Sequence, residues 1–83
     1  MAPALPMAYS KKIIRLNADA DPTLMGVTLG RLCILHSVPV NEICRDLDVS
    51  KAAVYRWFTG KHEVGKHLRS KVDAYYRSIL SRA

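Results

Sequence analysis

The chain has 83 residues, 49% of them hydrophobic, and a formal net charge of +6 at pH 7. A chain of this length makes one domain and buries only about 60% of its unfolded surface, which leaves little room for a deep catalytic cleft. The N-terminal stretch lacks the continuous apolar segment of a signal peptide, and no apolar run is long enough to span a membrane. We therefore expect neither a secreted nor a membrane protein.

The reactive side chains form no recognisable catalytic or metal-binding pattern. Cys33 and Cys44 fall on apolar faces, which predicts buried thiols in a reducing compartment and no disulfide. The three histidines have no metal-ligand spacing with these cysteines. The sequence also shows no Gly-rich phosphate loop, no nucleophile with a paired base and no carboxylate pair in a cleft. We therefore expect no enzyme, no metal site and no cofactor.

The excess of basic charge lies in the C-terminal part of the chain. Residues 1–48 contain five basic and five acidic residues, whereas residues 49–83 contain eight basic and two acidic residues. We therefore expect residues after position 48 to contact a polyanionic partner. A solvated surface that keeps the protein soluble is the alternative explanation of this charge.

Residues 1–16 are expected to form an N-terminal tail or arm, and residues 17–83 the folded domain. Two prolines and several small residues in the first nine positions indicate a loose tail. Basic and apolar residues follow each other in the stretch 11–16, which leaves several structures open. A docked segment is favoured there over a short strand, a helical turn or an arm that touches phosphate.

Asp21 and Pro22 are typical of a helix start, and they predict a helix that extends to Leu35. Gly26 and Gly30 are four residues apart and share a face of this helix. Each destabilises a helix interior by about 1 kcal/mol relative to alanine, so close approach of another helix is expected to offset that penalty. The residues expected to contact the helices that follow are Leu32 and Leu35.

The stretch 38–60 reads V-P-V-N-E-I-C-R-D-L-D-V-S-K-A-A-V-Y-R-W-F-T-G and predicts two short helices joined by a tight turn. Asp48 tolerates the left-handed conformation that a sharp turn requires. Ser50 is a good N-cap for the second helix, expected over residues 51–59, and Gly60 is a good C-terminal stop. The residues expected to form the core between the two helices are Ile43, Cys44, Leu47, Val49, Val54 and Trp57.

A last helix is predicted over residues 66–81, after a loop at residues 61–65. Its apolar stripe is expected to close the core against the helix that begins near Asp21. Any apolar surface left over would serve a homodimer through this C-terminal helix. The residues assigned to the stripe are Leu68, Val72, Tyr75 or Tyr76, Ile79 and Leu80.

The stretch 38–60 resembles the DNA-binding helix-turn-helix of the Cro and phage-repressor (XRE-like) family, whose typical form is L-T-x-x-E-L-A-x-x-L-G-V-S-x-x-x-I-x-x-W-x-N-G. Ile43, Cys44 and Val54 match that form in kind, and the ending W-F-T-G-K looks most like short phage-encoded regulators. The match covers between a quarter and a third of the chain. The identical positions are Glu42, Leu47, Val49, Ser50, Trp57 and Gly60.

The resemblance implies an all-α, small helix-turn-helix bundle of about four helices. It implies a phage-encoded, sequence-specific regulator of transcription that binds double-stranded DNA in the cytoplasm of a bacterial or infected host cell. The second helix of the motif would read the major groove with side chains on its outward face. The base-reading residues are then Lys51, Ala52, Tyr55 and Arg56, and the phosphate contacts are Ser50, Thr59 and Lys61.

The chain departs from the family where the first helix of the motif begins. The family usually has a capping threonine followed by a phosphate-binding glutamine, and these two places hold Pro39 and Val40. One family contact to the DNA backbone is therefore in doubt. A module that binds RNA polymerase or another protein would explain the missing glutamine. A third hypothesis is a non-specific architectural protein, which would bind all DNA duplexes alike.

Overall fold

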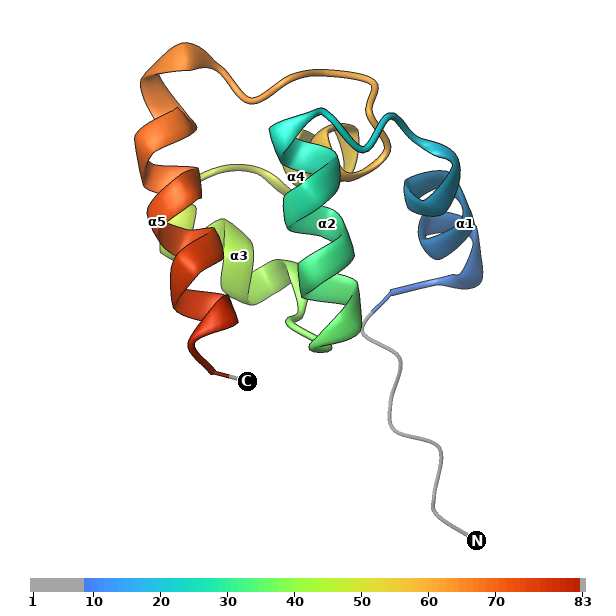
Figure 1. Cartoon of the computed structure of the whole chain (residues 1–83), viewed down its shortest axis with the longest axis horizontal. Coiled ribbons are helices and arrows are strands. Elements are labelled where there is room, and N and C mark those ends of the chain that lie inside the picture. Colours follow the sequence, from blue (N-terminus) through green and yellow to red (C-terminus); the bar gives the residue numbers. More distant parts are fainter. Residues whose placement is uncertain (1–8, 83) are drawn as a thin grey trace, which may run out of the picture.

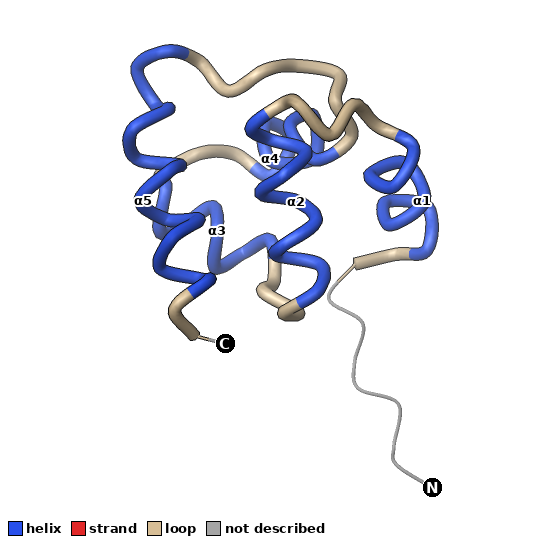
Figure 2. Tube along the Cα trace, viewed as in Figure 1, coloured by secondary structure: helices blue, strands red, loops and turns tan. Residues whose placement is uncertain are grey.

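The computed structural model describes residues 9–82, and every regular element in this range is helical (Figures 1 and 2). The all-α fold class is therefore confirmed, with one helix more than the four or so expected. Residues 1–8 and 83 lie outside the described residues. The described residues form the helices α1 (Lys11–Asp19), α2 (Met25–Leu35), α3 (Val40–Leu47), α4 (Lys51–Phe58) and α5 (Arg69–Leu80), with a short 3-10 helix, η1 (Lys66–Leu68), before α5.

The centre of the bundle is α2, which contacts α1, α4 and α5 (Figure 1). As expected, α5 closes the core against α2, and α3 packs against α4. Each helix contributes an apolar face of helical spacing, so burying these faces together is the main source of stability. The largest fully buried side chains are Phe58, Leu29, Ile43, Leu47 and Ile79.

The two glycines of α2 lie where α2 and α4 approach most closely. A Cβ atom built on Gly26 would lie 2.5 Å from the Cβ of Trp57 and 2.9 Å from its Cα. A Cβ atom built on Gly30 would lie 2.8 Å from Cγ of Phe58 and 2.7 Å from Nδ2 of Asn17. The expected close approach of another helix is thus confirmed, because no side chain fits at either position.

Three helices of the bundle end in the same way. A residue with positive φ follows each of α2, α3 and α4, and the next amide bonds back to the carbonyl five residues earlier. The sequence predicted two of these ends, at Asp48 (φ 56°) and Gly60 (φ 75°), but not the one at Ser37 (φ 54°). The three bonds are Val38 N to Cys33 O (2.9 Å), Val49 N to Cys44 O (3.1 Å) and Lys61 N to Arg56 O (3.0 Å).

The start of α2 differs from the expectation. The amide and the hydroxyl of Thr23 both donate to Oδ1 of Asp21, at 2.9 and 2.7 Å. Asp21 therefore closes a turn that precedes the helix, and α2 begins only at Met25. The expected contact of Leu35 is wrong, because its side chain is 76% exposed. Leu35 lies four residues after the exposed Arg31 and shares its face, whereas Leu32 is buried as expected.

The C-terminal helix agrees with the expectation except near its end. Its first turn is the 3-10 helix η1, and α5 then runs to Leu80. Val72 and Ile79 are buried, and both Tyr75 and Tyr76 are half-buried. Leu80, however, is 48% exposed, so its assignment to the buried stripe is wrong. It directly follows Ile79, and a step of about 100° around the helix turns it away from α2.

The N-terminal part of the domain extends further than predicted, because the expected boundary between residues 16 and 17 falls inside α1. The helix begins after Ser10, whose Oγ accepts a hydrogen bond of 3.2 Å from the amide of Ile13. Tyr9 is also buried, and its hydroxyl donates to the carbonyl of Val38 at 2.6 Å. The stretch 11–16 is therefore a docked helix, and the part of the expected tail before Tyr9 lies outside the described residues.

The close approach of α2 to α4 predicts that Gly26→Ala destabilises the protein. The added methyl group collides with Cβ and Cα of Trp57, and overpacking of this kind lowers the free energy of unfolding by about 1–3 kcal/mol. Thermal unfolding followed by circular dichroism should show a melting temperature lower by about 4–8 °C for each kcal/mol.

Gly65→Ala is the matched control for this experiment. Gly65 has a φ of −59°, and the Cβ atom would meet only the ring of His67, whose exposed side chain can move aside. This control should melt within a few degrees of the parent. Equal melting temperatures for both variants would mean that α2 and α4 do not touch at Gly26.

Candidate nucleic-acid interface

The turn between α3 and α4 consists of residues 48–50. Asp48 adopts the left-handed conformation, with φ 56° and ψ 53°, and Ser50 is extended, with φ −77° and ψ 157°. Oγ of Ser50 accepts a hydrogen bond of 3.1 Å from the amide of Ala53, which caps α4. The predicted roles of Asp48 in the turn and of Ser50 as the cap are both confirmed.

The inner faces of α3 and α4 meet in the hydrophobic core. Ile43, Leu47, Val54 and Trp57 are buried as predicted. The other two residues of the predicted core between these helices, Cys44 and Val49, are only half-buried and pack at its edge. With Phe58 also fully buried, the apolar side of α4 is committed to the core and its opposite side faces outward.

The outward side of α4 carries three of the four predicted base-reading residues. Lys51, Ala52 and Arg56 are exposed, and neither cation forms an ion pair within the described residues. Tyr55 differs, because it is half-buried and packs against the core. Its side chain is therefore less available than the sequence suggested.

The three predicted phosphate-contacting residues are placed around the ends of α4. Lys61 is exposed in the loop that follows the helix, whereas the hydroxyls of Ser50 and Thr59 already have partners. Ser50 caps the helix, and Oγ1 of Thr59 donates to the carbonyl of Tyr55 at 2.8 Å. Ser50 only accepts in its bond, so its hydroxyl hydrogen and the ammonium group of Lys61 remain available to donate, whereas the hydroxyl hydrogen of Thr59 is already used.

Val40 occupies the place where the resembled family has a phosphate-binding glutamine. Its side chain is only 8% exposed and belongs to the hydrophobic core. An aliphatic side chain in that position cannot donate a hydrogen bond to phosphate. Val40 therefore contributes packing at the start of α3.

The helix α1 fixes the C-terminal end of α4, which sequence analysis did not anticipate. Asn17 is 3% exposed, and its Nδ2 donates to the carbonyls of Phe58 (2.8 Å) and Val27 (3.2 Å). The ring of Tyr9 lies 5.6 Å from the ring of Phe58. The sequence did carry one signal, since the spacing of Ile13, Leu16 and Asn17 is that of a helix face.

The cations of α5 are largely committed to partners within the protein. Arg77 pairs with Asp73 at 3.1 Å, and Nζ of Lys71 donates to the carbonyl of Leu47 at 3.2 Å. The remaining ion pairs of this region are Arg69 with Glu63 (3.8 Å) and Arg82 with Glu42 (3.1 Å). By contrast, the cations of α1 and α4 form no ion pair among the described residues. They are Lys11, Lys12, Arg15, Lys51 and Arg56.

Burial keeps the reactive groups of the core in their neutral forms. It raises the pKa of the Cys33 thiol to about 12, so this group is not a thiolate at neutral pH. It also raises the pKa of Tyr9, whose hydroxyl acts as a hydrogen-bond donor to Val38. The pKa of Tyr75 is raised by burial and by the nearby Asp46 carboxylate, and no hydrogen-bond partner in residues 9–82 reaches its hydroxyl.

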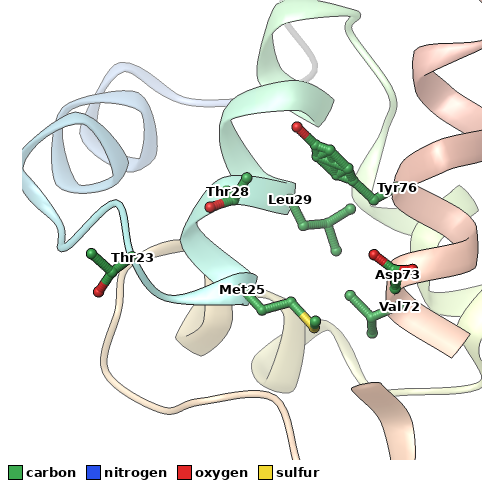
Figure 3. A pocket seen from close by; sticks show the side chains of 7 residues that line it. All are labelled: Thr23, Met25, Thr28, Leu29, Val72, Asp73 and Tyr76. Atoms are coloured by element: carbon green, nitrogen blue, oxygen red, sulfur yellow. The ribbon is translucent and has the colours of Figure 1, made fainter. Parts of the chain in front are cut away.

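A shallow hollow of about 370 Å³ lies between α2 and α5 (Figure 3). Met25, Leu29, Val72 and Tyr76 give it mostly apolar walls, and its one acidic side chain, Asp73, is paired with Arg77. It opens on the side of α2 that faces α5, whereas the glycines of α2 face α4. The hollow is therefore separate from the outward face of α4.

A scan against protein-family models found no match, and searches of curated proteins and of solved structures likewise found none. Within residues 9–82, no helix has the length and apolar character needed to cross a membrane. In the same part of the chain, no group of histidine, cysteine, aspartate or glutamate side chains is arranged to hold a metal ion.

The two bonds donated by Asn17 predict that Asn17→Ala destabilises the protein. The substitution leaves the buried carbonyl of Phe58 without its partner and removes a second bond from the carbonyl of Val27, which lowers the free energy of unfolding by about 1–3 kcal/mol. Urea unfolding should show an earlier midpoint. Asn41→Ala, at an exposed position of α3, is the control and should stay within about 0.5 kcal/mol of the parent. If both variants unfold alike, α1 is not held by Asn17.

The left-handed conformation of Asp48 predicts that Asp48→Gly is neutral or stabilises the protein slightly. Glycine adopts a φ of 56° without the strain that a Cβ atom causes, so the gain should reach about 1 kcal/mol at most. Asp46→Gly, in ordinary helical conformation two residues earlier, should lower stability instead. Urea unfolding of both variants gives the comparison, and marked destabilisation by Asp48→Gly would reveal a function for its carboxylate.

Proposed function

We propose that this chain is a sequence-specific regulator of transcription that binds double-stranded DNA through a helix-turn-helix formed by α3 and α4. The observation that carries the proposal is the outward face of α4, where Lys51, Ala52 and Arg56 are exposed while the opposite face is buried. The likeness of residues 38–60 to the Cro and phage-repressor family supports it. The ending of that stretch supports a phage origin, and hence action in the cytoplasm of a bacterial or infected host cell.

In this proposal α4 enters the major groove and reads base edges. Lys51 and Arg56 are five residues apart, about 7.5 Å along the helix axis, so both can reach one groove within a few base pairs. Arg56 can donate two hydrogen bonds to O6 and N7 of a guanine, and Lys51 can reach a guanine or a phosphate. Ala52 is small enough to lie against a thymine methyl group. Tyr55, being half-buried, is left with a contact at the edge of the site.

The ends of α4 would meet the DNA backbone. Lys61 is exposed just after the helix and can pair with a phosphate. The hydroxyl of Ser50 accepts from the amide of Ala53 and can still donate to a phosphate, whereas the hydroxyl of Thr59 already donates to Tyr55. Binding should therefore depend on few phosphate contacts near α4 itself.

A second function is favoured by the burial of Val40. Because the family's phosphate-binding side chain is replaced by a core residue, the same two helices could serve as a module that binds RNA polymerase or another protein. The exposed Leu80 supports a related proposal, a homodimer through the C-terminal helix. A protein partner or a second copy of the chain would bind surfaces other than Lys51 and Arg56. Substitution of these two residues therefore distinguishes such binding from base reading.

The base-reading role of α4 predicts that Arg56→Ala relaxes sequence preference. A duplex site is first selected from a random pool with the full chain at physiological salt. Arg56→Ala should then lose about 1–3 kcal/mol of discrimination at one position of that site. Lys51→Ala should act at a neighbouring position, or on all sequences equally if it meets phosphate. The measurement is competition between the selected site and its single-base variants at fixed salt.

Arg77→Ala is the control, since Arg77 is an exposed arginine of α5 that pairs with Asp73. It should leave the ranking of single-base variants unchanged. If neither Arg56→Ala nor Lys51→Ala alters the ranking, α4 does not read bases. If duplex binding also survives in the double variant, the protein-interaction module becomes the better proposal, and equal binding to all duplexes would favour an architectural protein.

A further inference from the structure

The helix α1 carries a basic face that the role of α4 does not explain. Lys11, Lys12 and Arg15 are all exposed, and none forms an ion pair within the described residues. Arg15 comes four residues after Lys11 and three after Lys12, so the three side chains share one side of the helix. Together with Leu16 they line a shallow hollow of about 290 Å³. The basic face of α1, as defined by these three cations, is thus a continuous surface.

These charges do not serve the stability of α1. Positive side chains are unfavourable near a helix N-terminus, where the backbone dipole is itself positive. Yet Lys11 and Lys12 occupy the first two positions of the helix, and no acidic residue lies in its first turn. The only acidic residue of α1 is Asp19, at its far end. A placement that weakens the helix calls for an external partner of negative charge.

The basic face of α1 belongs to a helix that is fixed beside α4. Tyr9, just before α1, stacks near the ring of Phe58, and Asn17 in its last turn bonds to the carbonyl of the same residue. Both contacts are to the C-terminal residue of α4. The two helices are therefore held together at both ends of α1, and α1 cannot move independently of the proposed recognition helix.

The width of the B-DNA major groove determines how near a helix beside α4 would lie to the phosphates. The major groove is about 12 Å wide, and one helix with its side chains has a diameter of about 10–12 Å. A helix inserted there fills the groove, so a second helix beside the end of the first, at the usual packing distance of about 8–10 Å, lies near the groove wall. The groove wall is formed by the phosphate backbone. Long cationic side chains exposed on the outer side of that second helix can then reach negative charge.

We infer that the basic face of α1 is a second DNA-contacting surface, which binds phosphates beside the groove that α4 enters. The inference rests on the proposed function, and it names where the backbone contacts come from. It also supplies a backbone contact that Val40, whose side chain is buried in the core, cannot make. Lys12 and Arg15 neutralise phosphates there and read no bases.

The test compares two double variants of the full chain on the duplex selected from the random pool. Lys12→Gln/Arg15→Gln removes two charges from α1. Arg69→Gln/Arg77→Gln removes two charges from exposed positions of α5. The two double variants therefore have the same net charge as each other. Affinity is measured over a range of salt concentrations, and circular dichroism checks that both variants melt like the parent.

The α1 variant should show a plot of log K against log salt that is shallower by about 1.8, since each lost phosphate contact contributes about 0.9. The α5 variant should keep the parent slope, and both should keep the parent ranking of single-base variants. A slope for the α1 variant equal to that of the α5 variant overturns the inference and leaves the proposed function intact. If the parent binds no duplex in a salt-dependent way, the proposed function itself fails, and the inference falls with it.

Discussion

The close approach of α2 to α4 is the constraint on which the rest of the structure depends. Gly26 lies against the backbone and Cβ of Trp57, and Gly30 lies against the ring of Phe58, so α2 has no room for a side chain at either position. This contact determines which side of α4 is buried. With that side committed to the core, Arg56 on the opposite side has to face solvent. The orientation of the proposed recognition face is thus a consequence of two glycines in a different helix.

Phe58 connects this contact to α1. Its ring is buried against Gly30 and near Tyr9, and its carbonyl accepts a hydrogen bond from Asn17. A carbonyl at the C-terminal end of a helix has no partner within that helix, so a buried one needs a donor from elsewhere. Asn17 supplies this donor from α1 and also bonds to Val27 of α2. One side chain therefore joins three helices at the end of α4.

Sequence analysis predicted what local rules determine and missed what distant contacts determine. The left-handed Asp48, the Ser50 cap and the burial of Trp57 follow from residue type and spacing within one stretch, and all three are confirmed. The hydrogen bond from Asn17 to Phe58 joins residues 41 positions apart, and no local sequence pattern predicts it. For the same reason α1 was predicted as part of a tail. The base-reading assignments stay predictions.

The distribution of charge shows why composition alone misplaces a binding surface. The whole net charge of +6 arises after residue 48, which pointed to α4 and α5 together. In the folded protein Arg77 and Arg82 are paired with carboxylates, and Lys71 is bonded to the end of α3. The attraction that a polyanion feels depends on charges that are exposed and uncompensated. Such charges lie on α4, on Lys61 and Lys66 after it, and also on α1, which belongs to the part of the chain whose net charge is zero.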